Sequence, residues 1–217
     1  MLGVHGRKPA TVVIEPIARS LVKAGISPNT VTVVGTLGAC VAALILIPTG
    51  HLFAAAIIIG LLTAVDMVDG TMARLRGGGT TFGATLDASC DRITDGAVFA
   101  AIVWWIVSAQ QGERHQLIAA LIVLVTSQVI SYVKARAEAG GLDIVGGLVE
   151  RPERLIIGLV GLGLEGLGVP HVLSIALWIL AIGSIFTVIQ RMVMASKSPH
   201  ANDKIAAPHG AKEFPTK

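Results

Sequence analysis

Charged residues are scarce in this chain of 217 residues, and long stretches contain none. Asp, Glu, Lys and Arg make up 14% of the sequence, against about 25% in a typical soluble domain. None of them occurs from Ala24 to Val65, and further uncharged stretches cover residues 96–112, 116–133 and 166–190. Since about 20 apolar residues span a bilayer as a helix, this pattern argues against a soluble helix bundle. It predicts an all-α, polytopic membrane protein.

Aromatic residues and cysteines are also rare, at 4% aromatics and two cysteines. Cys40 and Cys90 fall in different apolar segments, so we expect two small buried side chains and no disulfide framework. The formal net charge is +3, and the basic residues are spread over the segments that would flank a membrane. We therefore expect the lipid bilayer as a partner and no nucleic acid.

The apolar stretches predict six membrane-spanning helices, with a break at residues 48–51, where a proline and a glycine interrupt the first stretch. The expected spans are 29–47, 52–73, 83–108, 116–137, 153–168 and 170–194. An even number of spans places both termini on the same side. If that side is the cytoplasm, every Lys and Arg except Arg114 lies in or beside it, as the positive-inside rule requires.

Two segments fall outside these spans. In residues 11–23, apolar residues occupy one side of a helix, while Glu15, Arg19 and Lys23, spaced four apart, share the other. This predicts an amphipathic helix that lies in the cytoplasmic membrane interface and bends at Pro16. Residues 196–217 are rich in Lys, Pro and Ala, and we expect a disordered cytoplasmic tail after one membrane domain over residues 1–195.

Five aspartates lie at the ends of two expected spans, where charge is expensive and marks function. Asp66 and Asp69 are three residues apart and share one face of the second span. Asp87, Asp91 and Asp95 are four apart and line one face of the third span. Because the connection between the spans is short, the carboxylates converge near the cytoplasmic interface. Clusters of oxygen ligands suit hard divalent cations, so we predict a site for Mg²⁺ or Mn²⁺.

The same region contains a longer motif. The pattern Asp66-x₂-Asp69-Gly70-x₂-Ala73-Arg74-x₈-Gly83-x₃-Asp87-x₃-Asp91 resembles, at all of its fixed positions, the signature of the CDP-alcohol phosphotransferase family. Pro28, Asn29 and Thr32 also match the Pro-Asn-x-x-Thr segment that opens the first span in that family. The resemblance is specific over residues 27–95, and beyond them it rests on the number of spans and on basic residues.

The resemblance implies an enzyme that transfers the phosphatidyl group of CDP-diacylglycerol to a polar alcohol and releases CMP. It implies two ions of Mg²⁺ or Mn²⁺ per active site, bound by Asp66, Asp69, Asp87 and Asp91, with Asp91 also acting as the general base toward the acceptor hydroxyl. The donor site that it implies consists of Pro28, Asn29, Thr30, Val31, Thr32, Gly70, Arg74 and Thr80. It further implies a homodimer in the plasma membrane of a bacterium, with the active site facing the cytoplasm.

Asp95 lies outside the signature, and two roles stay open for it. Its carboxylate would orient a metal ligand or Arg92, or it would simply face a polar cavity.

Basic residues at the cytoplasmic ends of the last three spans bear on the acceptor. They are Lys134, Arg151, Arg154 and Arg191. Such a cluster binds a phosphate on the acceptor, or it only anchors the chain to lipid headgroups. Within the family, the whole chain most resembles bacterial members whose acceptor is inositol 1-phosphate, a phosphorylated polyol.

Two alternatives remain. Glycerol 3-phosphate is the nearest competing acceptor and would give phosphatidylglycerophosphate. Outside this enzyme class, a membrane cation transporter would also place aspartates in membrane helices, although here they lie at a helix end and not at mid-membrane.

Overall fold

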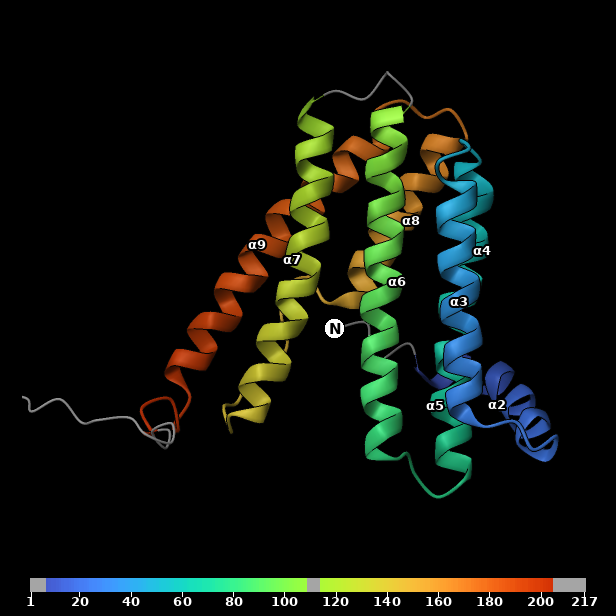
Figure 1. Cartoon of the computed structure of the whole chain (residues 1–217), viewed down its shortest axis with the longest axis vertical. Coiled ribbons are helices and arrows are strands. Elements are labelled where there is room, and N and C mark those ends of the chain that lie inside the picture. Colours follow the sequence, from blue (N-terminus) through green and yellow to red (C-terminus); the bar gives the residue numbers. More distant parts are fainter. Residues whose placement is uncertain (1–6, 109–113, 205–217) are drawn as a thin grey trace, which may run out of the picture.

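The computed structural model describes residues 7–108 and 114–204, and in this part of the chain every regular element is an α-helix (Figure 1). The helices are α2 (Arg7–Lys23), α3 (Pro28–Leu46), α4 (Leu52–Ala64), α5 (Asp66–Leu75), α6 (Thr81–Ser108), α7 (Arg114–Ala139), α8 (Arg151–Gly166) and α9 (Val172–Lys197). The prediction of an all-α protein is confirmed.

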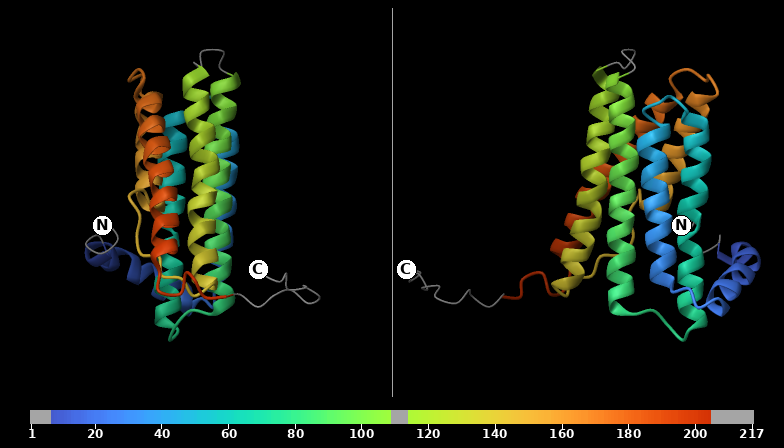
Figure 2. Two further views of the ribbon diagram at one scale, coloured as in Figure 1. Left: turned by 90° about the vertical axis from the view of Figure 1, so that its left-hand side faces the viewer. Right: turned by 45° about the vertical axis from the view of Figure 1, so that its right-hand side comes forward.

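Six of these helices form a closed ring of neighbours. Helix α3 packs on α4 and α6, α6 on α7, α7 on α9, α9 on α8, and α8 returns to α4. Helix α5 continues downward from α4, and α2 crosses beside it at the lower end of the bundle (Figures 1 and 2). The connections α5–α6 and α7–α8 and the end of α9 lie at this same lower end, where the predicted site residues gather.

Small residues bring the helices close together. Gly166 of α8 has room for no side chain, since a Cβ there would lie 2.4 Å from the backbone nitrogen of Phe53. A Cβ on Gly163 would lie 3.2 Å from the Cβ of Ala56, so α8 meets α4 almost backbone to backbone. Large apolar side chains such as Leu61 and Val125 point outward instead. This arrangement suits a bundle whose surroundings are lipid.

Four segments are long and apolar enough to cross a membrane by length and composition. They are Pro28–Leu46, Leu52–Leu75, Arg114–Ala139 and Val172–Lys197. The chain is therefore a multi-pass membrane protein. The other two expected spans correspond to α6, whose lower half carries the aspartates, and to α8, which has only 16 residues. A total of six spans stays a prediction.

The expected second span, 52–73, differs from the structure because it is divided at Val65 into α4 and α5. The hydroxyl of Thr63 donates to the carbonyl oxygens of Ile59 (2.9 Å) and Gly60 (3.1 Å). Such bonds compete with the helical ladder and bend helices. Val65 keeps helical dihedral angles (φ −62°, ψ −25°), so α5 continues after α4 with Asp66 in its first turn.

Helix α2 begins at Arg7, four residues before the expected start at residue 11. Its exposed side carries an ion pair of 2.6 Å between Arg19 and Glu15. On the opposite side, Ala18 is buried against Val68 and Met72 of α5. The helix is thus held to the bundle by its apolar side, and its position in the membrane interface stays a prediction.

Two expectations fall partly outside the described residues. Residues 205–217 of the expected tail lie outside the described part of the chain. So do residues 109–113, which precede Arg114, the one basic residue expected on the outer side. In the described part of the tail, α9 continues to Lys197, and the hydroxyl of Ser198 accepts a hydrogen bond of 3.1 Å from the backbone N–H of Asp143. The first residues after the last helix therefore contact the α7–α8 connection.

Candidate active site

The structure brings the four signature aspartates into electrostatic contact. Asp66 and Asp69 lie in the first turn of α5, and Asp87 and Asp91 lie on the lower half of α6. The charge of Asp87 acts on each of the other three, and the charge of Asp66 acts on both Asp69 and Asp91. These carboxylates repel one another when all are ionised, and a cation beside them would offset that repulsion.

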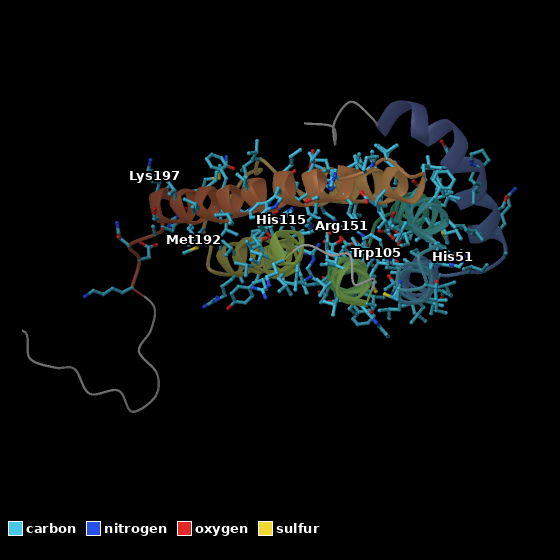
Figure 3. The ribbon with its side chains drawn as sticks, turned by 90° about the horizontal axis from the view of Figure 1, so that it is seen from above. His51, Trp105, His115, Arg151, Met192 and Lys197 are labelled. Carbon is cyan, nitrogen blue, oxygen red and sulfur yellow. The ribbon has the colours of Figure 1, made fainter. Side chains whose placement is uncertain are left out.

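Part of that positive charge comes from Arg151, at the first position of α8. Its Nη1 lies 3.0 Å from Oδ2 of Asp66, and its Nη2 lies 2.8 Å from Oδ1 of Asp91. Its Nε lies 3.7 Å from Oδ1 of Asp95. Seen from above, Arg151 lies inside the bundle (Figure 3). The sequence predicted this arginine as an acceptor residue, and its contacts with the aspartates were not expected.

The other two aspartates, Asp69 and Asp87, line a cavity of about 750 Å³ where α3, α5 and the start of α6 meet. The cavity is also lined by Ser27, Pro28, Asn29, Thr32, Gly70, Ala73, Arg76, Gly78, Gly79, Thr80, Thr81, Gly83 and Ala84. Five of the eight predicted donor residues are among these: Pro28, Asn29, Thr32, Gly70 and Thr80.

The remaining predicted donor residues, Thr30, Val31 and Arg74, are described but do not line the cavity. Arg74 donates instead to the hydroxyl of Thr71, one turn back on its own helix (2.9 Å). The arginine at the cavity is Arg76, which lies two residues after Arg74 in the variable part of the signature and which sequence reasoning missed. The helix ends at Leu75, so a residue just after it points differently from Arg74.

Two helix N-termini open onto this cavity. Ser27 caps α3 by accepting the backbone N–H of Thr30 (3.1 Å), and Thr80 accepts the N–H of Gly83 at the start of α6 (2.9 Å). A Cβ on Gly83 would lie 3.1 Å from Oγ1 of Thr80 and 3.2 Å from Oδ1 of Asn29, so glycine allows the two starts to meet. Exposed N–H groups at helix N-termini bind phosphate, which suits a nucleotide diphosphate.

One wall of the cavity is fixed by a side-chain contact. The hydroxyl of Thr32 on α3 donates to Oδ2 of Asp69 on α5, and both side chains are buried. This bond orients the carboxylate of Asp69 toward the cavity and ties α3 to α5.

Two of the four predicted acceptor residues are buried and paired with acidic side chains. Arg191 is 4% exposed and donates to the carbonyl oxygens of Ile130 (2.7 Å) and Gly146 (3.2 Å), with its Nη2 3.3 Å from Oε1 of Glu150. It therefore ties α9 to α7 and to the α7–α8 connection. Arg154 is 1% exposed and pairs with Asp95.

The pair of Asp95 and Arg154 differs from both roles that the sequence left open for Asp95. This aspartate is fully buried, and Oδ2 accepts from Nη2 of Arg154 while Oδ1 faces Arg151. It is therefore the counter-ion of two arginines of α8. Arg92 instead lies near Asp91, at 3.4 Å. Lys134 is the exposed member of the predicted acceptor set, at 43%, and lies 3.9 Å from Oε1 of Glu138.

The side chains proposed as metal ligands are chemically suited to a hard divalent cation. The four signature carboxylates act on one another electrostatically, and carboxylate oxygens are the ligands that Mg²⁺ and Mn²⁺ prefer. Among residues 7–108 and 114–204, no three acidic, histidine or cysteine side chains are gathered closely enough to hold an ion as they stand. The guanidinium of Arg151 contacts two of these carboxylates, those of Asp66 and Asp91.

Comparison with known proteins gives one family. Residues 25–189 match the family model described as CDP-alcohol phosphatidyltransferase. A protein of Corynebacterium glutamicum named phosphatidylinositol phosphate synthase is 59% identical over 98% of this chain and 97% of its own length. A protein of the same name from Mycobacteroides abscessus is 52% identical over 94% of this chain and 92% of its own length.

Solved structures agree with these sequence matches. The crystal structure of Mycobacterium tuberculosis phosphatidylinositol phosphate synthase with CDP-DAG bound superposes with a TM-score of 0.86 at 50% identity, covering 90% of this chain and 99% of the other. A structure of the same enzyme with manganese and citrate has a TM-score of 0.84 at 51% identity, covering 89% of this chain and 93% of the other.

Proposed function

The chain belongs to the CDP-alcohol phosphatidyltransferase family, and we propose that it transfers the phosphatidyl group of CDP-diacylglycerol to inositol 1-phosphate. CMP is released and phosphatidylinositol phosphate is formed, as a step of phospholipid biosynthesis. One observation carries the proposal: all four signature aspartates lie at one end of the bundle. Asp69 and Asp87 line the cavity there, and Asp66 and Asp91 contact Arg151. Relatives over nearly the whole chain support the choice of acceptor.

The cavity between α3, α5 and α6 receives the CDP group of the donor. Its volume of about 750 Å³ suits a nucleotide, and two helix N-termini and Arg76 supply donors for the pyrophosphate. A related enzyme has been crystallised with CDP-DAG bound, which supports a donor site of this kind. The diacylglycerol chains then extend along the outward apolar surface of the bundle into the lipid.

Asp66, Asp69, Asp87 and Asp91 are the residues that would hold two ions of Mg²⁺ or Mn²⁺. When bound, such ions neutralise the pyrophosphate and stabilise the attacking and leaving oxygens of an in-line displacement. The structure of a relative in complex with manganese supports a divalent metal here. Within the chain, Thr32 holds Asp69 in place for this task.

Asp91 acts as the general base. It removes the proton from the attacking hydroxyl of the acceptor, the hydroxyl oxygen forms the new bond to the phosphatidyl phosphorus, and the bond to the CMP oxygen breaks. Asp91 is suited to this role because its Oδ1 lies 2.8 Å from Nη2 of Arg151, a proposed acceptor residue.

The acceptor's phosphate is bound by Arg151 and Lys134, which keep accessible surface at the lower end of the bundle. Arg154 and Arg191, the other two predicted acceptor residues, act on this site through their neighbours. Arg154 holds Asp95 beside Arg151. Arg191 holds Glu150, which directly precedes Arg151 in the chain. Their charges add to the local positive potential without a direct bond to the phosphate.

The placement in the membrane completes the proposal. Six spans cross the bacterial plasma membrane, α2 lies in the cytoplasmic interface, and both termini and the active site face the cytoplasm. This orientation follows the distribution of Lys and Arg, and the cytoplasm is where a soluble phosphorylated acceptor is available. Two copies of the chain form a homodimer.

The acceptor assignment is tested with purified protein, CDP-diacylglycerol and a panel of acceptors: inositol 1-phosphate, inositol and glycerol 3-phosphate. We expect the highest kcat/KM with inositol 1-phosphate, because inositol leaves the charged donors of the acceptor site unpaired. Equal rates with inositol and inositol 1-phosphate would reassign Lys134 and Arg151 to membrane anchoring. Faster turnover with glycerol 3-phosphate would replace the acceptor and keep the rest.

A further inference from the structure

Arg151 belongs to both halves of the proposed active site. Its two terminal nitrogens contact Asp66 and Asp91, at 3.0 and 2.8 Å, and these carboxylates are proposed metal ligands. The same two nitrogens are the groups that would bind the acceptor's phosphate. Binding a phosphate through both nitrogens therefore competes with their contacts to Asp66 and Asp91.

We propose that Arg151 is an exchangeable counter-ion, which binds Asp66 and Asp91 until these carboxylates take divalent ions and which is then released to bind the acceptor's phosphate. This inference rests on the proposed function, since it assigns a phosphate to the acceptor. Its consequence is an order of events: the acceptor binds well only to an enzyme whose metal site is loaded. An acceptor that arrives early finds no free guanidinium.

Charge and geometry favour the exchange. A divalent ion would bring twice the charge of a guanidinium to the same two carboxylates, and it would repel a guanidinium that contacts them at 3.0 and 2.8 Å. The side chains of Arg151, Asp66 and Asp91 are 21%, 20% and 17% exposed, so ions from solution reach them.

A second contact keeps the released side chain near the site. Nε of Arg151 lies 3.7 Å from Oδ1 of Asp95, and Asp95 is fixed by the buried Arg154. Asp95 is not among the proposed metal ligands, so it retains its charge for Arg151 in both states. Arg151 therefore pivots beside Asp95 while its terminal nitrogens exchange partners, and Asp95 acts as a positioning residue.

Other basic residues of the cluster are not placed for this exchange. Arg191 is engaged with two backbone carbonyls and Glu150, and Arg154 is closed from solvent. Lys134 lies 3.9 Å from Glu138 on its own helix, and among the described residues it forms no ion pair with the aspartates. Lys134 consequently offers a matched control: its loss removes one positive charge at the same end of the bundle without removing a contact to Asp66 or Asp91.

The first test measures Mn²⁺ binding to the purified full chain without substrates, by isothermal titration calorimetry and by the electron paramagnetic resonance signal of free Mn²⁺. If the guanidinium occupies the site nine-tenths of the time, its removal raises the apparent affinity about tenfold. We expect Arg151→Gln to bind Mn²⁺ about tenfold more tightly than the native chain, and Lys134→Gln to change the affinity less than about twofold. Arg151→Lys, which cannot bridge two carboxylates, is expected to lie between native and Arg151→Gln.

Unchanged or weaker Mn²⁺ binding by Arg151→Gln would overturn the exchange. If that variant does not fold in detergent, Arg151→Lys is measured in its place. A Mn²⁺ affinity of Arg151→Lys no higher than that of the native chain would equally overturn the exchange. A rise of the same size in Lys134→Gln would also overturn it, because general electrostatics would then explain the effect.

The second test measures binding of inositol 1-phosphate to the same proteins, with Mn²⁺ and with Mn²⁺ replaced by chelator. We expect Mn²⁺ to tighten binding to the native chain about tenfold and to leave the weak binding to Arg151→Gln unchanged, because coupling between two sites is reciprocal. No tightening in the native chain with any phosphorylated acceptor would contradict the exchange. Tightening with glycerol 3-phosphate in place of inositol 1-phosphate would support the exchange and contradict the proposed acceptor.

Discussion

Asp95 of α6 and Arg154 of α8 form an ion pair that is closed to solvent, with exposed fractions of 0% and 1%. Nε and Nη1 of Arg154 have no hydrogen-bond partner among the described residues, so Asp95 is the group that compensates its charge. Breaking a buried pair by removing one partner is strongly destabilising, because the remaining charge stays buried without compensation. The pair therefore holds α8 to α6 at the level of the active site.

Replacing Arg154 is expected mainly to lower the stability of the protein. We predict that Arg154→Gln lowers the free energy of unfolding by about 3–5 kcal/mol, measured as a lower unfolding midpoint in detergent. Lys134→Gln, which removes an exposed charge, is the control and is expected to cost less than about 1 kcal/mol. A native unfolding midpoint together with a raised KM for the acceptor would show instead that Arg154 binds the phosphate directly.

Replacement of Asp66 and replacement of Asp91 are expected to weaken donor binding to different extents. Asp66→Asn and Asp91→Asn each remove an anionic ligand, so both are expected to reduce turnover to background, as excess chelator is for the native chain. Donor binding is expected to fall less in Asp91→Asn than in Asp66→Asn, because Asp91 is proposed to serve the acceptor as well as a metal ion. The measurement is binding of CDP-diacylglycerol in the presence of Mn²⁺. Equal loss of donor binding in both variants would mean that Asp91 is a metal ligand and nothing more.

The sequence can predict which site residues lie near one another where short spacings decide the geometry. Asp66 and Asp69, and then Asp87 and Asp91, are brought together because each pair lies on one face of a helix and the connection is short. The Pro28–Thr32 segment reaches the cavity because a serine N-cap and a proline at the first position start α3 there.

What the sequence could not supply are the partners of the basic residues. Arg151, Arg154 and Arg191 lie on α8 and α9. Their contacts are with α5, α6, α7 and the α7–α8 connection, 41 to 85 residues away in the chain. Such pairs depend on how the helices are arranged around the ring, which helical periodicity does not specify. Arg154 and Arg151 are also three residues apart, so the sequence placed both on one face, and only packing makes one buried and the other accessible.

Gly83 offers a test of the donor cavity. A Cβ at this position would press on Thr80 and Asn29, at 3.1 and 3.2 Å, so we predict that Gly83→Ala raises the donor KM about tenfold while overpacking costs about 1–3 kcal/mol. Gly96→Ala is the matched control on the same helix, since a Cβ there meets Gln128 at an ordinary 3.7 Å. Steady-state kinetics with CDP-diacylglycerol as the varied substrate measure the effect. Similar donor KM values for the two variants would place the nucleotide away from the start of α6.

The central claim is that this acidic site transfers a phosphatidyl group to a phosphorylated acceptor. Its most direct measurement follows CMP release from CDP-diacylglycerol by the purified protein with Mn²⁺, together with the mass of the lipid product. The account predicts that CMP appears when inositol 1-phosphate is added, that phosphatidylinositol phosphate forms in equal amount, and that neither appears with Asp91→Asn. CMP release at the same rate without acceptor, or none with any acceptor of the panel, would contradict it.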